Sequence, residues 1–183
     1  MPVFPPAVPP VPRDTAAGIF HVYTHCVYAA PSLYRDDVDR LNALRHLAAV
    51  TGKPGFDCLA YCLMGTHYHL LVEVEDDVLP KTMHALNLGY ARDFNRRYGL
   101  KGHVQARPYG SRRIRSAGSL LTRFRYVARN PVRAGLCASP ERWQWSSFAG
   151  TAGIGERSSF VADDRILDLV DAPGDLLGLV RDT

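Results

Sequence analysis

The chain has 183 residues, 46% of them hydrophobic, and a formal net charge of +4. This length and hydrophobic content suffice for one hydrophobic core but not for two domains that each have a core of their own. No apolar run approaches the roughly 18 residues of a membrane span and no cationic segment leads into a long apolar stretch, so we expect a cytoplasmic protein that does not enter a membrane. Four cysteines without paired spacing favour buried free thiols over a disulfide framework or a zinc site.

The chain starts with a proline-rich segment. Six of the first twelve residues are proline, which leaves few amide donors and favours extended backbone, so residues 1–17 are predicted to form a flexible arm. Ile19 to Tyr28 follows with alternating β-branched and aromatic residues and is predicted to be the first strand. His21 and His25 lie on one side of it. A histidine in a strand is more often a packing or surface residue than a ligand, so we interpret both as structural.

Three further elements are predicted before residue 100. Residues 36–52 begin with two aspartates, continue with apolar residues at helical spacing and end in glycine, which predicts an amphipathic helix. Residues 56–74 are rich in β-favouring residues and broken only by Gly65, which predicts two strands or one long bent strand. Residues 76–99 repeat the helical pattern with two aspartates at the start and glycine at the end.

A histidine pair stands inside the predicted strand region. The period of two in a strand puts His67 and His69 on the same face, and two imidazoles that point one way are a candidate metal site. An isolated pair of this kind is more often two ordinary polar residues on the open face of a sheet. A histidine-triad hydrolase would need a third histidine where this chain has Leu71, which argues against that class.

Positive charge is concentrated between residues 92 and 133, where twelve Lys or Arg residues accompany one acid, a local charge of +11. Residues 160–183 carry six aspartates and two arginines, a charge of −4. A one-sided basic block favours binding to a polyanion, most simply nucleic-acid phosphate; a basic surface kept for solubility is the alternative. The candidate phosphate contacts are Arg92, Arg96, Arg97, Arg107, Arg112, Arg113, Arg115, Arg123 and Arg133.

A third helix is predicted from about Ser119, after an irregular hairpin or edge strand over residues 103–114. One face of the helix is apolar. A second face, at intervals of three and four residues, carries Arg123, Tyr126, Asn130 and Arg133. Pro131 has no amide donor and disfavours helical backbone at Asn130, so we expect the helix to kink or end there. Capping a helix end is the ordinary role of such an asparagine.

Three segments together resemble the HUH single-strand transposases, and in particular their REP-associated tyrosine transposase branch. The histidine pair lies within Tyr61–Val72, the tyrosine and the Asn-Pro pair lie within Tyr126–Leu136, and a tryptophan motif follows at Trp143–Phe148. Phe20–Tyr23 is similar to the opening strand of that branch. The resemblance covers roughly residues 18 to 150, which would be the catalytic domain, and it leaves residues 151–183 as an acidic, partly helical C-terminal tail.

The resemblance implies a site and a reaction. His67, His69 and the amide oxygen of Asn130 would bind a divalent ion, with Mg²⁺ expected and Mn²⁺ a plausible substitute. Tyr126 would attack a DNA phosphate and form a 5′-phosphotyrosine linkage with release of a 3′-OH. The sequence leaves the general base open. The partner would be single-stranded or hairpin DNA, and a monomer is favoured over a homodimer.

The predicted fold class is α+β, with an antiparallel sheet and helices packed mainly on one face in the ferredoxin-like or RNA-recognition-like manner of HUH nucleases. This topology follows chiefly from the resemblance, because the order of elements by itself supports α+β without specifying how the strands pair. The predicted function is a metal-dependent DNA nickase and strand transferase. The alternative is a DNA-binding or regulatory protein derived from a transposase that has lost catalysis.

Overall fold

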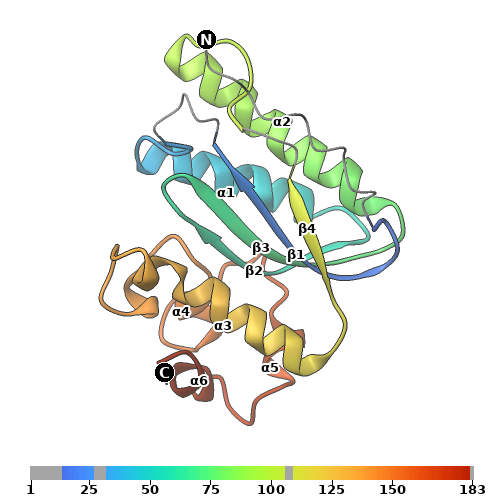
Figure 1. Ribbon diagram of the computed structural model, residues 1–183, viewed down its shortest axis with the longest axis vertical. Helices are drawn as coiled ribbons and strands as arrows, with labels where there is room; N and C mark the ends of the chain where they lie inside the picture. Colours follow the sequence, from blue (N-terminus) through green and yellow to red (C-terminus); the bar gives the residue numbers. More distant parts are fainter. Residues whose placement is uncertain (1–13, 27–31, 106–108, 182–183) are drawn as a thin grey trace, which may run out of the picture.

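Alternating apolar side chains build a sheet at the centre of the molecule. The structure, a computed structural model, describes residues 14–26, 32–105 and 109–181. Four antiparallel strands lie in the order β2-β3-β1-β4, so that β3 and β1 are central (Figure 1). Their bounds are Gly18–His25 for β1, Phe56–Leu63 for β2, His67–Val74 for β3 and Gly110–Ile114 for β4. The 56–74 region is therefore two strands, one of the two predicted possibilities.

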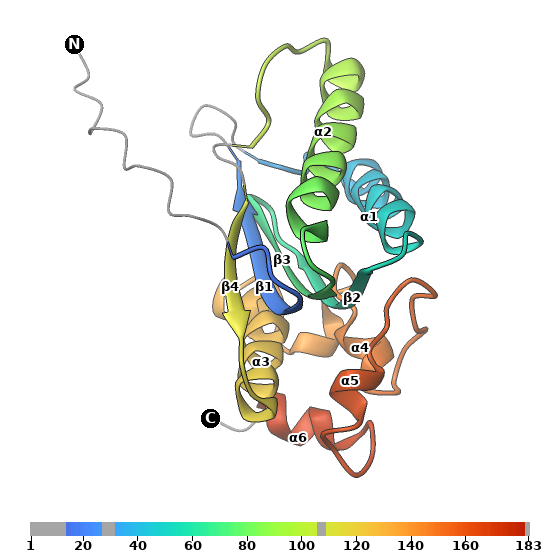
Figure 2. The same cartoon turned by 90° about the vertical axis from the view of Figure 1, so that its right-hand side faces the viewer.

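Two long helices cover one face of the sheet (Figure 2). α1 (Asp37–Thr51) begins where the Asp36 side chain accepts a hydrogen bond from the next turn of the backbone. α2 (Val78–Tyr98) ends at Gly99, whose φ of 63° is the left-handed conformation that glycine adopts without a steric cost. Both helices lie where the sequence predicts them. The core that they share with the sheet includes Phe20, Val22, Leu47, Leu70, Met83 and Tyr90.

The opposite face of the sheet is covered by α3 (Ala117–Arg133), which runs across the strands (Figures 1 and 2). Phe124 and Val127 of α3 are buried against Leu71 of β3. In the described part of the chain, four short helical segments lie in the same layer: η1 (Pro140–Arg142), α4 (Phe148–Thr151), α5 (Asp164–Leu167) and α6 (Asp175–Arg181). The sheet is therefore the middle of three layers.

The sequence predicts that the helix kinks or ends near Asn130; α3 does not end there but continues through Pro131 to Arg133. The proline stands in the last turn, where its missing amide costs one hydrogen bond. The backbone beyond it is still satisfied, because the amides of Ala134 and Leu136 donate to carbonyls of this last turn. The extension keeps Arg133 on the helical stripe of Tyr126 and Asn130.

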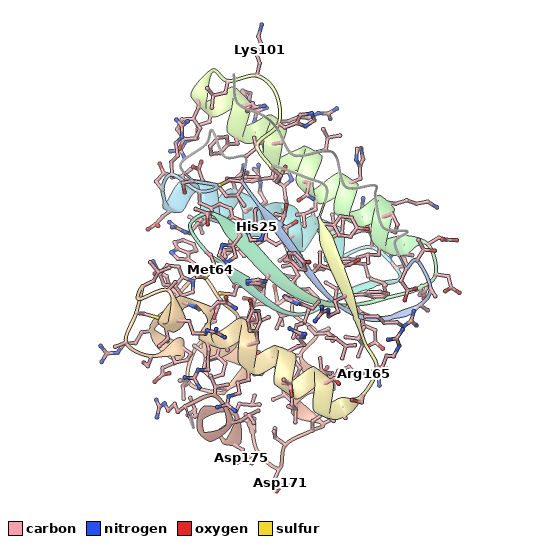
Figure 3. The ribbon with its side chains drawn as sticks, in the orientation of Figure 1. His25, Met64, Lys101, Arg165, Asp171 and Asp175 are labelled. Atoms are coloured by element: carbon pink, nitrogen blue, oxygen red, sulfur yellow. The ribbon has the colours of Figure 1, made fainter. Side chains whose placement is uncertain are left out.

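The predicted α+β fold with an antiparallel sheet is confirmed. The prediction that helices pack mainly on one face describes α1 and α2, while α3 and the short helices cover the other face. The predicted acidic tail contributes Ile166, Leu176 and Val180 to the core beneath α3, although Asp171 and Asp175 remain at the outside of this layer (Figure 3). Among the described residues, no helix is both long and apolar enough to cross a membrane.

The tryptophan motif covers the outer edge of β2. The indole N–H of Trp143 donates to the carbonyl of Leu63 at 2.9 Å, and the amide of Leu63 donates to the carbonyl of Trp145 at 2.8 Å. Further along, the amide of Ser147 donates to the carbonyl of Tyr61. The segment therefore satisfies backbone groups that an edge strand would otherwise leave open for pairing with another chain.

Candidate functional site

The antiparallel pairing of β1 with β3 brings four histidines together on the face that α3 crosses. His25 lies opposite His67, and His21 lies two residues along from Tyr23, the partner of His69. Ring centroids are 5.1 Å apart for His25 and His67, and 5.0 Å apart for His67 and His69. Figure 3 labels His25 at this part of the sheet. The residues of the predicted pair therefore do share a face, and they are joined by two more imidazoles.

His21 is the closest neighbour of His69 in this cluster. Its Nε2 lies 3.0 Å from Nδ1 of His69, and both side chains are buried. The sequence predicts His21 and His25 only as structural residues, because nothing local says which strand lies beside β3. The available signal was the alternation that places His21, Tyr23 and His25 on one side of their strand.

Burial keeps the imidazoles of His21, His67 and His69 neutral. Desolvation lowers the pKa of His69 to about 3, with smaller contributions from the neighbouring histidines. Desolvation also lowers the pKa of His67 to about 4 and that of His21 to about 4, the latter helped by the charges of Arg123 and Arg112. A neutral imidazole has a free lone pair, which is the form that binds metal ions.

Tyr126 reaches the histidines from α3. Its ring centroid lies 5.5 Å from that of His69 and 5.8 Å from that of His21, in edge-on contacts. The guanidinium groups of Arg123 and Arg133 each lie 5.8 Å from the centre of the Tyr126 ring. The helical stripe predicted from the sequence therefore faces the histidines, with the tyrosine in its middle and a cation on each side.

Asn130 stands one turn beyond Tyr126 and next to His69. Its side-chain amide nitrogen, Nδ2, donates to the backbone carbonyl of Tyr126 at 2.7 Å. This bond orients the amide and does not use its oxygen. The asparagine side chain also lies near enough to His69 to raise the pKa of the imidazole slightly, the smallest of the effects on that group. Asn130 is thus held against its own helix and at the histidine cluster at once.

The donor atoms at this place fit a divalent ion. His69 Nε2 is buried and has no hydrogen-bond partner among the described residues, while His67 Nδ1 lies 3.1 Å from the Thr66 hydroxyl, so its Nε2 is left for another partner. No group of three or more His, Cys, Asp or Glu side chains in the described part of the chain could hold a metal ion. A metal bound by His67 and His69 would therefore need further donors, and the amide oxygen of Asn130 is one that the chain offers at this place.

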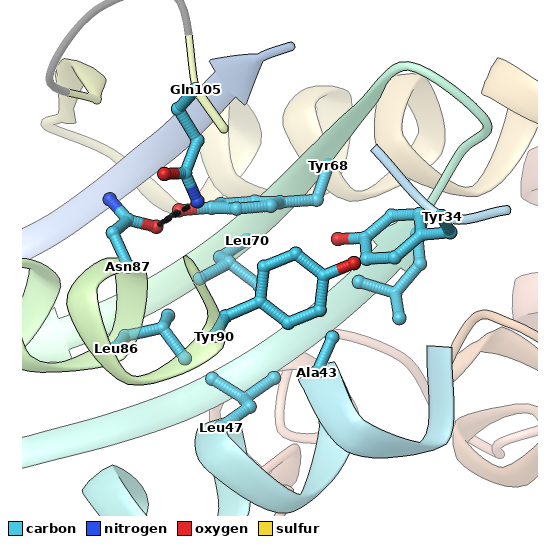
Figure 4. A pocket seen from close by; sticks show the side chains of 10 residues that line it. Tyr34, Ala43, Leu47, Tyr68, Leu70, Leu86, Asn87, Tyr90 and Gln105 are labelled. Carbon is cyan, nitrogen blue, oxygen red and sulfur yellow. Dashed lines mark hydrogen bonds between the residues drawn. The ribbon is translucent and has the colours of Figure 1, made fainter. Parts of the chain in front are cut away.

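Tyr68, between the two histidines, points the other way. It is buried in the layer of α1 and α2, where its hydroxyl donates to Asn87 Oδ1 at 2.7 Å. Figure 4 shows it beside Tyr34 and Tyr90 in a pocket under these helices. The prediction that Tyr68 packs on the far side of the sheet is confirmed.

The candidate phosphate-binding arginines fall into two layers. Arg112 on β4, together with Arg123 and Arg133 on α3, belongs to the histidine side. On the far side, Arg96 pairs with Asp93, and Arg97 pairs with Asp36, which precedes α1, and with Asp39 in α1. Arg113 pairs with Asp14 and stacks on Phe20. Arg92 and Arg115 are exposed, and Arg107 lies outside the described residues.

Comparison with known proteins supports the fold. No family model matches the sequence, and no curated protein sequence matches it. Among solved structures, a REP-associated tyrosine transposase bound to a REP hairpin superposes with a TM-score of 0.67 and 17% sequence identity, over 85% of this chain and 92% of that one. The chain therefore has the fold of a REP-associated tyrosine transposase.

Proposed function

We propose that the protein cuts and joins single-stranded DNA through Tyr126, as a tyrosine transposase does. The observation that carries this proposal is the contact of Tyr126 on α3 with His69, one of the histidine pair on β3, because α3 and β3 are separate elements and no local pattern requires them to meet. The arginines on each side of Tyr126 would hold the negative charge of the DNA backbone.

The proposed chemistry is a phosphoryl transfer to the tyrosine. The phenolic oxygen of Tyr126 gives up its proton and forms a bond to phosphorus, the bond from phosphorus to the 3′ oxygen breaks, and the leaving oxygen takes up a proton to become a 3′-OH, so that one proton is released and one is taken up. The bond energy remains in the 5′-phosphotyrosine, so another 3′-OH can reverse the step and join two strands. Arg123 and Arg133 would orient the phosphate for attack by the phenolic oxygen of Tyr126.

A divalent ion would complete this site. His67, His69 and Asn130 would hold Mg²⁺, or Mn²⁺ in its place, and the ion would supply positive charge to the scissile phosphate. The support is the donor set itself: two neutral imidazoles, one with a buried nitrogen that has no partner among the described residues, and an amide whose oxygen is not used by its hydrogen bond to the helix.

The proposed substrate is a DNA hairpin with an unpaired flank. Support comes from the neighbour with the same fold, which is bound to a REP hairpin, and from the basic residues around Tyr126. The same features would also serve a protein that binds such DNA without cutting it, so the test has to separate binding from covalent chemistry.

The test is a covalent adduct on a denaturing gel. The protein is incubated with labelled hairpin oligonucleotides and Mg²⁺ or Mn²⁺; we expect a DNA adduct from the parent protein and none from Tyr126→Phe, because the phenylalanine has no oxygen to form the bond. Tyr98→Phe is the matched control, since this tyrosine lies in the opposite layer with its hydroxyl on Asp39, and it should form the adduct normally.

Two results would contradict the proposal. An undiminished adduct from Tyr126→Phe would assign the nucleophile to another residue. Absence of any adduct from the parent protein on an oligonucleotide that it binds would leave a DNA-binding protein without nicking activity.

A further inference from the structure

Tyr23 is an exposed aromatic residue at the edge of the histidine cluster. It lies on β1 between His21 and His25, on the face that α3 crosses, and its side chain is 36% exposed. Its ring centroid is 5.5 Å from that of His21 and 6.4 Å from that of His69. No step of the proposed reaction uses this ring, although it borders the place where the phosphate would sit.

Gly110 on the neighbouring strand makes room for the ring. The two residues are partners in the pairing of β1 with β4, and a Cβ at position 110 would lie 2.5 Å from Cζ of Tyr23. The tyrosine ring therefore lies across the backbone of β4, over a residue that has no side chain. This arrangement leaves a flat aromatic surface on the sheet beside the site.

A cation accompanies the ring on the same strand. Arg112 pairs in register with His21, two residues along β4 from Gly110, so it lies on the same face of the sheet. Its side chain is exposed, and its charge is close enough to lower the pKa of His21. An aromatic surface next to an exposed cation is the combination that binds a base and its phosphate in single-stranded nucleic acid.

We propose that Tyr23 is a stacking platform for one unpaired base beside the scissile phosphate. This inference rests on the proposed function and adds a binding subsite to it. The ligand is a nucleobase of single-stranded DNA, of any of the four kinds, because every base has a face that stacks on an aromatic ring. In duplex DNA both faces of a base are covered by its neighbours, so the platform favours an unpaired nucleotide at this position.

The test is a binding measurement with abasic substitutions. Fluorescence anisotropy is recorded for Tyr126→Phe, which cannot form the adduct, with hairpin oligonucleotides whose flanking nucleotides are replaced one at a time by an abasic residue. Tyr23→Ala in this background should weaken binding to the intact oligonucleotide by about fivefold to 150-fold, the loss of one stacked base. Tyr23→Phe and Tyr23→Trp, which keep an aromatic face, should bind like the background protein.

Non-additivity identifies the base. If one base stacks on Tyr23, removing that base should weaken binding of the background protein about as much as Tyr23→Ala weakens binding to intact DNA. Removing the same base should cause no further loss of affinity in Tyr23→Ala. Gly110→Ala keeps the tyrosine but displaces its ring, so it should also weaken binding to intact DNA. Circular dichroism on each variant confirms that the fold is kept.

The outcomes separate this inference from the proposed function. If protein with Tyr126 intact forms the adduct but Tyr23→Ala binds within twofold of its background, or loses affinity equally at every abasic position, the platform is overturned alone. If the abasic pattern is present but no adduct forms, the platform stands and the chemistry fails. Absence of binding to any of these oligonucleotides would overturn both.

Discussion

At the scale of single residues, the two ring nitrogens of His69 have different surroundings. Nδ1 lies 3.0 Å from His21 Nε2, whereas Nε2 is buried without a hydrogen-bond partner among the described residues. A ligand histidine usually has its second nitrogen held by a neighbour, which determines the tautomer and the orientation of the ring. If His69 is a metal ligand as proposed, His21 would hold its ring in place, and the backbone carbonyl of Tyr126 would hold the side-chain amide of Asn130 in the same way.

Removal of divalent metal ions should stop the covalent reaction and leave DNA binding in place. With a chelator present we expect no adduct, and addition of Mg²⁺ or Mn²⁺ should restore it, because two neutral imidazoles and an amide carry no charge of their own to stabilise the phosphate. The measurement is the denaturing-gel assay alongside a binding titration. Full adduct formation in the presence of the chelator would show that the covalent reaction does not need a divalent metal ion.

Substitution of His21 should weaken metal binding without removing a ligand. We expect His21→Ala to lower the affinity for Mn²⁺ by about tenfold to 100-fold, the usual effect of losing the neighbour that orients a ligand histidine. The measurement is isothermal titration of the metal-free protein with Mn²⁺. His46→Ala is the matched control, since His46 pairs with Asp93 in the opposite layer, and it should bind Mn²⁺ as the parent does. Equal affinities for both variants would contradict a positioning role for His21.

At the scale of elements, each part of the site depends on a pairing between segments far apart in the chain. α3 presents Tyr126 and Asn130 because its apolar residues bury against β2 and β3, and the histidines converge because β1 is inserted between β3 and β4. On the other side of β3, the outer edge of β2 is closed by the tryptophan motif. The motif that follows the tyrosine helix in sequence thus stabilises the sheet on which the histidines stand.

Loss of the indole N–H of Trp143 should lower the stability of the fold and leave adduct formation largely unchanged. In Trp143→Phe the carbonyl of Leu63 loses its donor at a half-buried position, and we expect the free energy of unfolding to fall by about 1 to 3 kcal/mol. The measurement is urea unfolding followed by circular dichroism. Adduct formation by the folded variant should be kept, because the indole N–H bonds to β2 and not to Tyr126. An unchanged free energy of unfolding would mean that this bond contributes nothing to the edge.

At the scale of the whole molecule, the sheet separates two kinds of charge arrangement. On the side of α1 and α2, Asp93 is paired with Arg45, Arg96 and His46, and Arg97 with two carboxylates. On the side of α3, Arg112, Arg123 and Arg133 have no carboxylate partner among the described residues. Arg96 and Arg97 are therefore paired with carboxylates on one side of the sheet, whereas Arg112, Arg123 and Arg133 on the other side are available for phosphate, so DNA should bind on the histidine side.

The salt dependence of DNA binding should differ between variants of the arginines on the two sides of the sheet. Substituting Arg112, Arg123 or Arg133 by alanine should weaken binding to all sequences alike and reduce the slope of log K against log salt by about one for each phosphate that the variant no longer neutralises. Arg96→Ala is the matched control, because its partner is Asp93, and it should leave the slope unchanged. The measurement is a binding titration at several salt concentrations. A larger fall in slope for Arg96→Ala than for the other three variants would place the DNA on the side of α1 and α2 instead.

Local patterns were enough to predict α1, α2, the strand character of the 56–74 region, the common face of His67 and His69, and the stripe that carries Tyr126, because strand and helix periods depend only on neighbouring residues. Tertiary structure alone decided that β1 lies beside β3, which brings in His21, and that the arginines divide between two layers. It also placed the C-terminal residues in the core and carried α3 past Asn130 to Arg133. These features depend on which distant segments pair and pack, and the periodicity of a single segment holds no information about its partner.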